Sequence, residues 1–189
     1  DVVIGFPIEG RRTADIDELV GFFINTLSIR IDLAGSPNTA ELIDRVKGRA
    51  LDALVHQEIP FERLVEDLAV ARSLLHAPIF QAWFNWQPQL SGGFSLEGLS
   101  EEFLASLVSV SRFDVLLSLA PSADGSISGY LEYDSSLFMK STVLSWSSQF
   151  SRLIEKVVVD SQNPVASFCL INPSDRQKVL QKFNDTDRP

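Results

Sequence analysis

The feature that most constrains the fold is a strict two-residue alternation followed at once by a helical pattern. From Thr26 to Leu33 every second residue is apolar, and polar residues stand between them. Such alternation is typical of a strand with one buried face. After a turn at 35–38, Asn38 and Glu41 resemble a capping box, and apolar residues recur at helical spacing as far as Leu54. A half-buried strand joined to an amphipathic helix predicts a sheet that a helix covers.

Other segments extend this succession. We expect further strands at 1–6, 80–86, 102–110, 113–120 and 127–133, and further helices at 15–23, 60–69, 140–159 and 174–183. Asp124-Gly125 predicts a hairpin between the last two strands, and Gly92-Gly93 predicts a loop. Because most strands follow one another in a run separate from the helices, the order predicts an α+β layered sandwich with a mostly antiparallel sheet.

Composition excludes several classes of protein. The 189 residues are 45% hydrophobic and 22% charged, which suits one soluble domain or a large lobe. No apolar run approaches the length of a membrane span. The net charge of −9 comes without a basic stripe, which argues against binding to nucleic acid or to an anionic membrane surface. The single cysteine, Cys169, permits no internal disulfide and suits a reducing, cytoplasmic location.

Both ends suggest a piece of a longer polypeptide. The chain opens within an apolar strand pattern, its only methionine is Met139, and it closes on the polar segment 184–189. We therefore expect a fragment.

Generic catalytic patterns are missing from the sequence. The two histidines, His56 and His76, stand twenty residues apart, and there is no HExxH, GxSxG, GxxxxGK[ST], GxGxxG or CxxC pattern. Paired carboxylates such as Glu66-Asp67 fall on the outer face of an expected helix, where solvation explains them. We expect no metal site and no complete catalytic triad in this chain.

Three short clusters carry more information than local structure requires. Residues 20–30 read VGFFINTLSIR, residues 56–62 read HQEIPFE, and residues 72–81 read RSLLHAPIFQ. Taken singly, the first suits the end of a helix and the start of a strand, the second a corner between two helices, and the third the entry to a strand.

In this order the clusters resemble the C-terminal half of the condensation domains of nonribosomal peptide synthetases. The family pattern (I/V)GxFVNT…R is met by residues 20–30, with Ile24 for valine, and the pattern (H/N)QxxPFE is met in full by residues 56–62. The third pattern, RDxSRNPL, is met only in part, because Ser73 stands for the aspartate and 75–77 differ.

Shorter matches extend the resemblance over the whole chain. They are a Pro-x-x-Gly-Arg segment at 7–11, Phe113-Asp114, residues 131–133 and the tail at 183–186. The tail resembles the linker into a following adenylation domain. The resemblance implies a lobe at 1–171 and a linker at 172–189.

The resemblance implies a fold and an activity. Such domains are V-shaped pairs of lobes, each similar to chloramphenicol acetyltransferase. A tunnel between the lobes receives two phosphopantetheine arms, and an amide bond forms between a donor acyl or peptidyl thioester and an acceptor aminoacyl thioester. The implied partners are the N-terminal lobe, the upstream and downstream peptidyl carrier proteins and the adjacent adenylation domain. No cofactor is expected to bind this lobe directly.

The resemblance also assigns roles to residues. The family's catalytic histidine lies in an HHxxxDG motif of the other lobe, so we expect no catalytic residue in this chain and no activity from it alone. Asn25, Thr26 and Gln81 are expected near the tunnel, although Asn25 equally suits a structural role at the strand entry. Motif residues with expected structural roles are Gly21, Phe23, Arg30, His56, Gln57, Pro60, Phe61, Glu62, Arg72 and Pro78.

Two alternatives stay open at this point. The chain suits a protein-interaction lobe that performs no turnover. It also suits a related acyltransferase, or an epimerisation or heterocyclisation relative of the same fold, although the complete HQxxPFE match favours condensation.

Overall fold

The computed structural model describes residues 1–189 except 12, 17, 71–76, 88–109, 123, 173–175 and 186–189. Its strands are β1 (Val2–Glu9), β2 (Ile24–Ile31), β3 (Ala82–Trp86), β4 (Val115–Pro121) and β5 (Ile127–Tyr133). Its helices are α1 (Thr39–Val55), α2 (Phe61–Asp67) and α3 (Lys140–Val159), with short turns η1 (Ala14–Ile16), η2 (Val165–Ser167) and η3 (Lys178–Lys182). The loop predicted at Gly92-Gly93 lies outside the described residues, as does the strand predicted at 102–110 apart from Val110.

The five strands form one sheet in the order β2-β1-β3-β4-β5. The pairs β1–β2 and β4–β5 are antiparallel, whereas β1–β3 and β3–β4 are parallel. The predicted α+β class is confirmed, but the sheet is mixed and not mostly antiparallel. The reason is that α1 and α2 carry the chain from β2 past β1, so β3 enters the sheet beside β1 and parallel to it.

The register divides the sheet into two faces. Ile4 pairs with Ala82 and Ala82 with Val115, so these residues share one face with Leu27 and Leu117. We call this the helix face, because α1 packs on β2 and α3 packs along β5 on this side. Gly5, Trp83 and Ser118 point to the opposite face, which we call the aromatic face.

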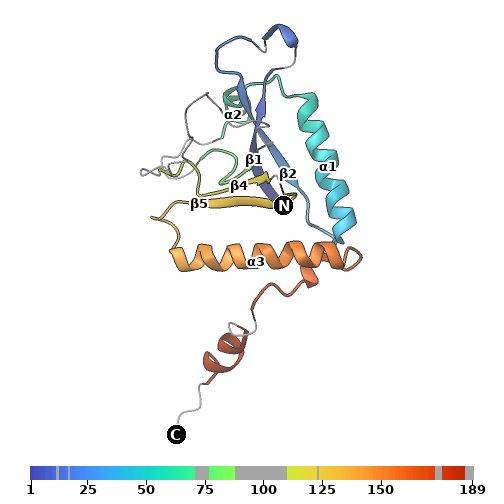
Figure 1. The fold of residues 1–189 in the computed structure, drawn as a ribbon, viewed down its shortest axis with the longest axis vertical. Helices are drawn as coiled ribbons and strands as arrows, with labels where there is room; N and C mark the ends of the chain where they lie inside the picture. Colours follow the sequence, from blue (N-terminus) through green and yellow to red (C-terminus); the bar gives the residue numbers. More distant parts are fainter. Residues whose placement is uncertain are drawn as a thin grey trace.

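The two long helices lie over opposite edges of the sheet. In Figure 1, α1 runs beside β2 and α3 runs beside β5, and the two helices point in different directions. A sheet twists by roughly 20–25° per strand, so its two edge strands also differ in direction. The helices follow their own edge strands.

The start of α1, the bounds of α3 and the last hairpin agree with the predictions from the sequence. Asn38 accepts a hydrogen bond from the Glu41 backbone N–H at 2.9 Å, and the Glu41 carboxylate accepts one from the Asn38 backbone N–H at 3.1 Å. This confirms the predicted capping box of α1. The predicted helix at 140–159 and the hairpin at Asp124-Gly125 are confirmed as well, with Gly125 at φ +83°.

The helix predicted at 15–23 is wrong. Only the short turn η1 forms there, and Leu19, Val20 and Phe22 are exposed. The Arg11 guanidinium donates to the carbonyl oxygens of Ile16 and Leu19, which would otherwise accept helical hydrogen bonds. An irregular loop therefore replaces the helix that periodicity predicts.

Near the C-terminus, the helix predicted at 174–183 is helical over 176–182, and 174–175 lie outside the described residues. This segment contains η3 (Lys178–Lys182) and extends away from the sheet (Figure 1). Across the described residues, the chain contains no helix long and apolar enough to cross a membrane.

Candidate functional site

The side chain of Asn25 joins two of the motifs found in the sequence. Its Nδ2 donates to the carbonyl oxygens of Gln57 at 2.8 Å and Ile59 at 2.9 Å. Its Oδ1 accepts from the backbone N–H of Thr26 at 2.8 Å and of Phe61 at 3.3 Å. One amide group thus satisfies four backbone groups, three of them more than thirty residues away in sequence.

This junction lies where the chain passes around the edge of the sheet. α1 covers β2 on the helix face, and the corner at 56–60 leads into α2, whose first residue, Phe61, contacts the aromatic face. Pro60 precedes α2 with φ −60°, a value that its ring imposes. Asn25 therefore fixes the place where the HQEIPFE corner crosses β2.

A cluster of aromatic rings packs on the aromatic face, next to the point where the HQEIPFE corner crosses β2. The Phe80 ring lies 5.4 Å from the Phe61 ring and 5.8 Å from those of Trp83 and Phe113, between centroids. Trp83 and Phe113 stack at 4.5 Å. Phe80 is only 2% exposed, and its ring fills the space that a side chain on Gly5 would occupy. The HQEIPFE corner, β1, β3 and Phe113 therefore all lie against the buried Phe80 ring.

The backbone before Phe80 is strained. Ile79 has φ +70°, and the Phe80 N–H donates to the Pro78 carbonyl oxygen at 2.8 Å, which closes a three-residue turn. A β-branched residue rarely adopts such a φ. The buried Phe80 ring stabilises this turn, which directs the chain into β3.

The loop between β1 and β2 is closed by the Gly10-Arg11 pair. The Gly10 N–H donates to the Phe23 carbonyl oxygen at 2.7 Å, and a side chain at position 10 would collide with that oxygen. The Arg11 guanidinium lies 4.3 Å from the centre of the Phe23 ring. The Pro-x-x-Gly-Arg segment and Phe23 thus hold the start of β2, next to Asn25.

A hollow of about 470 Å³ adjoins the Asn25 junction. Its lining combines aromatic rings, amides and two carboxylates: Gly10, Phe22, Phe23, Ile24, Asn25, Thr26, Gln57, Glu58, Pro60, Phe61 and Glu62. The Asn25 amide is occupied by backbone partners, so it shapes the wall of this hollow.

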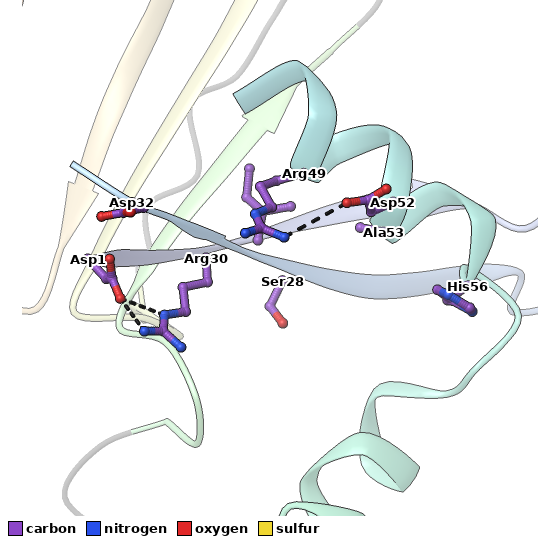
Figure 2. Close-up of a pocket in the computed structure, with 9 residues that line it drawn as sticks. Asp1, Ser28, Arg30, Asp32, Arg49, Asp52, Ala53 and His56 are labelled. Atoms are coloured by element: carbon purple, nitrogen blue, oxygen red, sulfur yellow. Dashed lines mark hydrogen bonds and ion pairs between the residues drawn. The ribbon is translucent and has the colours of Figure 1, made fainter. Parts of the chain in front are cut away.

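A second hollow, shown in Figure 2, lies along the open edge of β2 beside α1. The Asp1 carboxylate pairs with Arg30, and Arg49 Nη1 lies 3.9 Å from Asp52 Oδ2. His56 is exposed at the end of α1 and faces the same hollow. These are exposed charges, whose pairs contribute little to stability.

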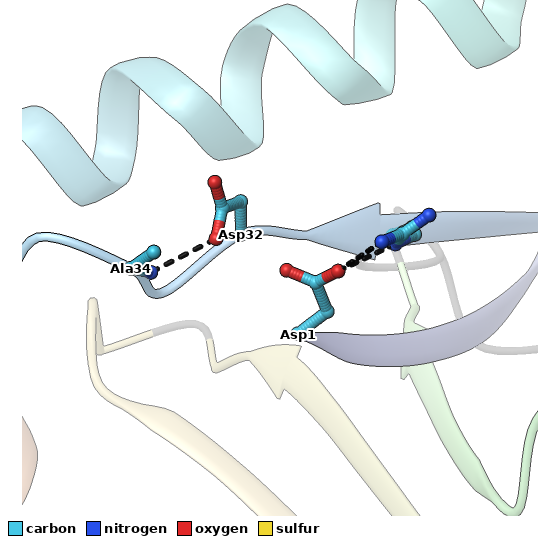
Figure 3. Close-up of polar contacts among 4 residues, drawn as sticks. Asp1, Asp32 and Ala34 are labelled. Atoms are coloured by element: carbon cyan, nitrogen blue, oxygen red, sulfur yellow. Dashed lines mark hydrogen bonds and ion pairs between the residues drawn. The ribbon is translucent and has the colours of Figure 1, made fainter.

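Asp32 continues this charged edge (Figure 3). Its carboxylate accepts a hydrogen bond from the Ala34 N–H at 2.9 Å, and this bond, assisted by the nearby Arg45 guanidinium, lowers the pKa of Asp32. A lowered pKa keeps the group ionised at neutral pH, which suits a turn acceptor and not a general acid.

The other predicted site residues are dispersed. Gln81 is exposed, donates to the Ala77 carbonyl oxygen at 3.2 Å and is not among the residues that line the hollow beside Asn25. Gln57 donates through Nε2 to the Leu54 carbonyl oxygen at 2.8 Å. Gly21 is exposed in the irregular loop. Arg72 lies outside the described residues.

The structure adds residues that sequence reasoning missed. Gly5 gives room to the Phe80 ring, and Ser118, only 1% exposed, accepts a hydrogen bond from Asn85 Nδ2 at 3.4 Å on the aromatic face. A glycine within an apolar strand pattern is a signal for close approach, and it stands in the sequence at position 5. The pairing of Asn85 with Ser118 carries no local signal.

A search for metal-binding geometry gives a negative result over the described ranges. They contain no group of three or more His, Cys, Asp or Glu side chains placed to hold a metal ion.

Comparison with protein families gives one match to most of the chain. Residues 1–180 match the family described as "Condensation domain". Among curated proteins, malpinin synthetase of Mortierella alpina is 37% identical over 186 residues, which are 98% of this chain and 2% of that protein. One of the linear gramicidin synthase proteins of Brevibacillus parabrevis is 36% identical over 189 residues, with 98% and 4% covered. The chain thus spans a small fraction of these relatives.

Solved structures agree. The crystal structure of the X-domain from teicoplanin biosynthesis superimposes with a TM-score of 0.79 at 25% identity, over 90% of this chain and 40% of that one. The first condensation domain of the CDA synthetase superimposes with a TM-score of 0.72 at 19% identity, over 91% and 38%. The second likeness concerns the fold alone.

Proposed function

Because this chain belongs to the condensation-domain family of nonribosomal peptide synthetases, we propose that it forms the C-terminal lobe of a domain that makes amide bonds. The proposed substrates are a donor acyl or peptidyl thioester and an acceptor aminoacyl thioester, each carried on the phosphopantetheine arm of a carrier protein. Residues 1–171 would form the lobe, and 172–189 the linker towards an adenylation domain.

In the proposed reaction, the acceptor's amino nitrogen attacks the carbonyl carbon of the donor thioester. A C–N bond forms, the C–S bond breaks, and the proton lost from nitrogen ends on the released thiol. No HHxxxDG motif stands in these residues, so the catalytic histidine is assigned to the other lobe. This lobe contributes by holding two tethered reactants in line, which makes the attack effectively unimolecular.

The observation that carries the proposal is the junction at Asn25. Two family motifs, at 20–30 and 56–62, meet through one side-chain amide that binds three backbone groups of the corner. Phe80, from the third cluster at 72–81, packs against Phe61 beneath the same corner. We assign to these motifs the rigid wall of the tunnel, with Asn25, Thr26 and Gln81 as its tunnel-proximal residues.

The proposed setting follows from the relatives. Their synthetase names support a multimodular enzyme of secondary metabolism in which carrier proteins and an adenylation domain are neighbours of this lobe. We propose a cytoplasmic location, because a single cysteine, which permits no internal disulfide, fits a reducing compartment.

The test uses the intact two-lobe domain with loaded donor and acceptor carrier proteins. Asn25→Ala is expected to slow dipeptide formation by about 10- to 100-fold at a temperature where the domain stays folded, because misplacing the wall by about 1 Å disturbs alignment. The matched control is Asp44→Ala on the outer side of α1, which should keep full turnover. Dipeptide release is measured by mass spectrometry.

Three results would oppose the proposal. Unchanged turnover of Asn25→Ala would remove Asn25 from the site. Amide formation by residues 1–189 alone would contradict the assignment of the catalytic base to the other lobe. A wild-type two-lobe domain that binds both carrier proteins and forms no amide would instead support an interaction lobe without turnover.

A further inference from the structure

Phe80 lies on the opposite face of the sheet from the one that regular alternation predicts. Ala82 and Phe84 of β3 point to the helix face, and a residue two positions before Ala82 in an extended strand would point the same way. The Phe80 ring instead lies 5.8 Å from the Trp83 ring and against the position that a side chain on Gly5 would occupy, both on the aromatic face. The strand expected at 80–86 accordingly begins at Ala82.

The backbone just before β3 produces this change of face. Ile79 has φ +70°, and the Phe80 N–H donates to the Pro78 carbonyl oxygen at 2.8 Å. This is the geometry of a classic γ-turn, which is rare and strained. The Gln81 side-chain amide donates to the Ala77 carbonyl oxygen at 3.2 Å and closes the same segment a second time. The chain therefore reverses within a few residues and directs the Phe80 ring to the aromatic face.

Ile79 differs from the other residues that adopt a positive φ. In the part of the chain that the structure describes, the non-glycine residues with a positive φ are Ser36 at +51°, Ala69 at +48° and Ile79 at +70°. Ala69 follows the last turn of α2, where left-handed backbone is common. Ile79 is β-branched, and such a residue is a genuine outlier at positive φ. Its conformation is imposed by the packing around it and not by its own preference.

A continuous series of contacts runs from this turn to the corner. The Phe80 ring, only 2% exposed, lies 5.4 Å from the Phe61 ring between centroids. The Phe61 N–H donates to Asn25 Oδ1 at 3.3 Å, and Asn25 Nδ2 donates to the carbonyl oxygens of Gln57 and Ile59. The packing of Phe61 thus depends on a ring whose direction the turn sets.

We propose that the strained turn at Ile79 holds the Asn25 corner in place, so that the turn and the corner open together as one unit. Loss of the turn withdraws the Phe80 ring from Phe61, and the corner then loses the ring that packs beneath it. Ile79 is a positioning residue, which acts through Phe80 and Phe61 on the wall that Asn25 shapes. Its effect on turnover rests on the proposed function, whereas the coupling of turn and corner does not.

Hydrogen exchange at the Phe61 N–H tests the coupling in the intact two-lobe domain. Ile79→Ala and Ile79→Gly both remove the side chain, and they differ in the cost of a positive φ, which is absent for glycine. The Phe61 N–H is expected to exchange about tenfold more slowly in Ile79→Gly than in Ile79→Ala, because the turn opens less often. Equal exchange in the two variants would overturn the proposal.

Ser36→Ala and Ser36→Gly are the matched control pair. Ser36 also has a positive φ, and it lies before α1, at the opposite end of that helix from the corner. This pair should leave exchange at the Phe61 N–H equal within about twofold. A tenfold difference here as well would show that this N–H exchanges only when the whole domain unfolds, and would overturn the assignment of a separate unit.

Dipeptide formation from loaded carrier proteins tests the positioning role, at a temperature where the domain stays folded. Ile79→Pro cannot adopt a positive φ. Its kcat should be at least ~10-fold below that of Ile79→Gly, which can form the turn, and its KM for the acceptor carrier protein should change less than about threefold. Equal kcat values in the two folded variants would overturn the positioning role.

Two further outcomes separate this proposal from the proposed function. A wild-type domain that forms no amide would overturn the proposed function and the effect on turnover, while a tenfold difference in exchange would still support the coupling. If Ile79→Pro does not fold, the exchange rates of Ile79→Ala and Ile79→Gly decide.

Discussion

The corner at Asn25 and the central strands on the helix face are different kinds of region. At the corner, one polar side chain satisfies four backbone groups, and the buried Phe80 ring packs against Phe61 beneath them. On the helix face, the apolar residues Ile4, Phe6, Phe84 and Leu117 of the three central strands are only partly buried. The corner thus depends on specific hydrogen bonds, whereas the helix face depends on apolar packing.

The comparison shows that short sequence motifs and apolar periodicity specify different parts of the fold. The motif residues of the corner fix a backbone path that apolar periodicity cannot encode, namely the passage of the chain around the edge strand β2. The helix face needs no particular residue, because any apolar side chain of suitable size can pack there. Short motifs therefore mark the corner, whereas the helix face shows only as an apolar pattern.

The largest effect is expected from Phe80→Ala, which removes the ring beneath the corner. Loss of a nearly buried phenylalanine should lower the free energy of unfolding of the domain by about 3–5 kcal/mol. Phe22→Ala, at a residue that is 90% exposed, is the control and should change it by less than about 0.5 kcal/mol. Urea unfolding measures both free energies. A similar decrease in the two variants would contradict the expected difference between the buried Phe80 ring and the exposed loop.

A smaller effect is expected from Asn25→Ala, about 1–2 kcal/mol, because water replaces some of the lost partners at this partly exposed place. Asn25→Asp keeps the acceptor but turns an oxygen towards the carbonyls of Gln57 and Ile59. It should destabilise the domain at neutral pH at least as much as alanine does. If Asn25→Asp unfolds like the wild type in urea, the amide does not hold the corner.

The smallest effect is expected at the hairpin turn, outside both regions. The Ser126 hydroxyl and N–H donate to Asp124 Oδ1 at 2.6 and 2.9 Å, and the hydroxyl bond is the main cause of the lowered pKa of Asp124. A lowered folded-state pKa adds stability above the unfolded-state value of about 3.9, and this stability is lost as the pH falls through the folded-state pKa. Asp124→Ala should therefore lower Tm slightly at neutral pH and not at a pH of about 2.

Ser126→Ala is the matched variant for this measurement. It removes the main cause of the lowered pKa of Asp124 and keeps the carboxylate. The Tm of this variant should therefore change less between neutral pH and a pH of about 2 than the Tm of the wild type does. A pH-independent deficit for Asp124→Ala would show that the turn residue acts through packing and not through its charge.

Much of the local structure could be predicted from the sequence. The bounds of α3 and β5, the capping box of Asn38 and the hairpin at Asp124-Gly125 depend on residues close to one another in the chain, where propensity and capping decide. The condensation-domain family was also identifiable, because its motifs stand at characteristic distances.

The errors arose where distant residues compete with local preference. The helix expected at 15–23 is replaced by a loop, since Arg11 takes the carbonyl oxygens of Ile16 and Leu19. The parallel placement of β3 was missed, because strand order depends on where the chain returns to the sheet. For the candidate site, the sequence indicated Asn25 and Phe61 as motif residues without indicating that they contact each other.

The sequence by itself determined most of the strands and helices outside 15–23, which faces are apolar and which family the chain belongs to, because periodicity, caps and motif spacing are local properties. The tertiary structure alone decided that the Asn25 amide binds the corner and that Phe80 lies against Gly5. It also decided that α1 packs on the edge strand β2 and α3 on the edge strand β5. These outcomes depend on the twist and strand order of the sheet, which bring together residues that no pattern in the sequence connects.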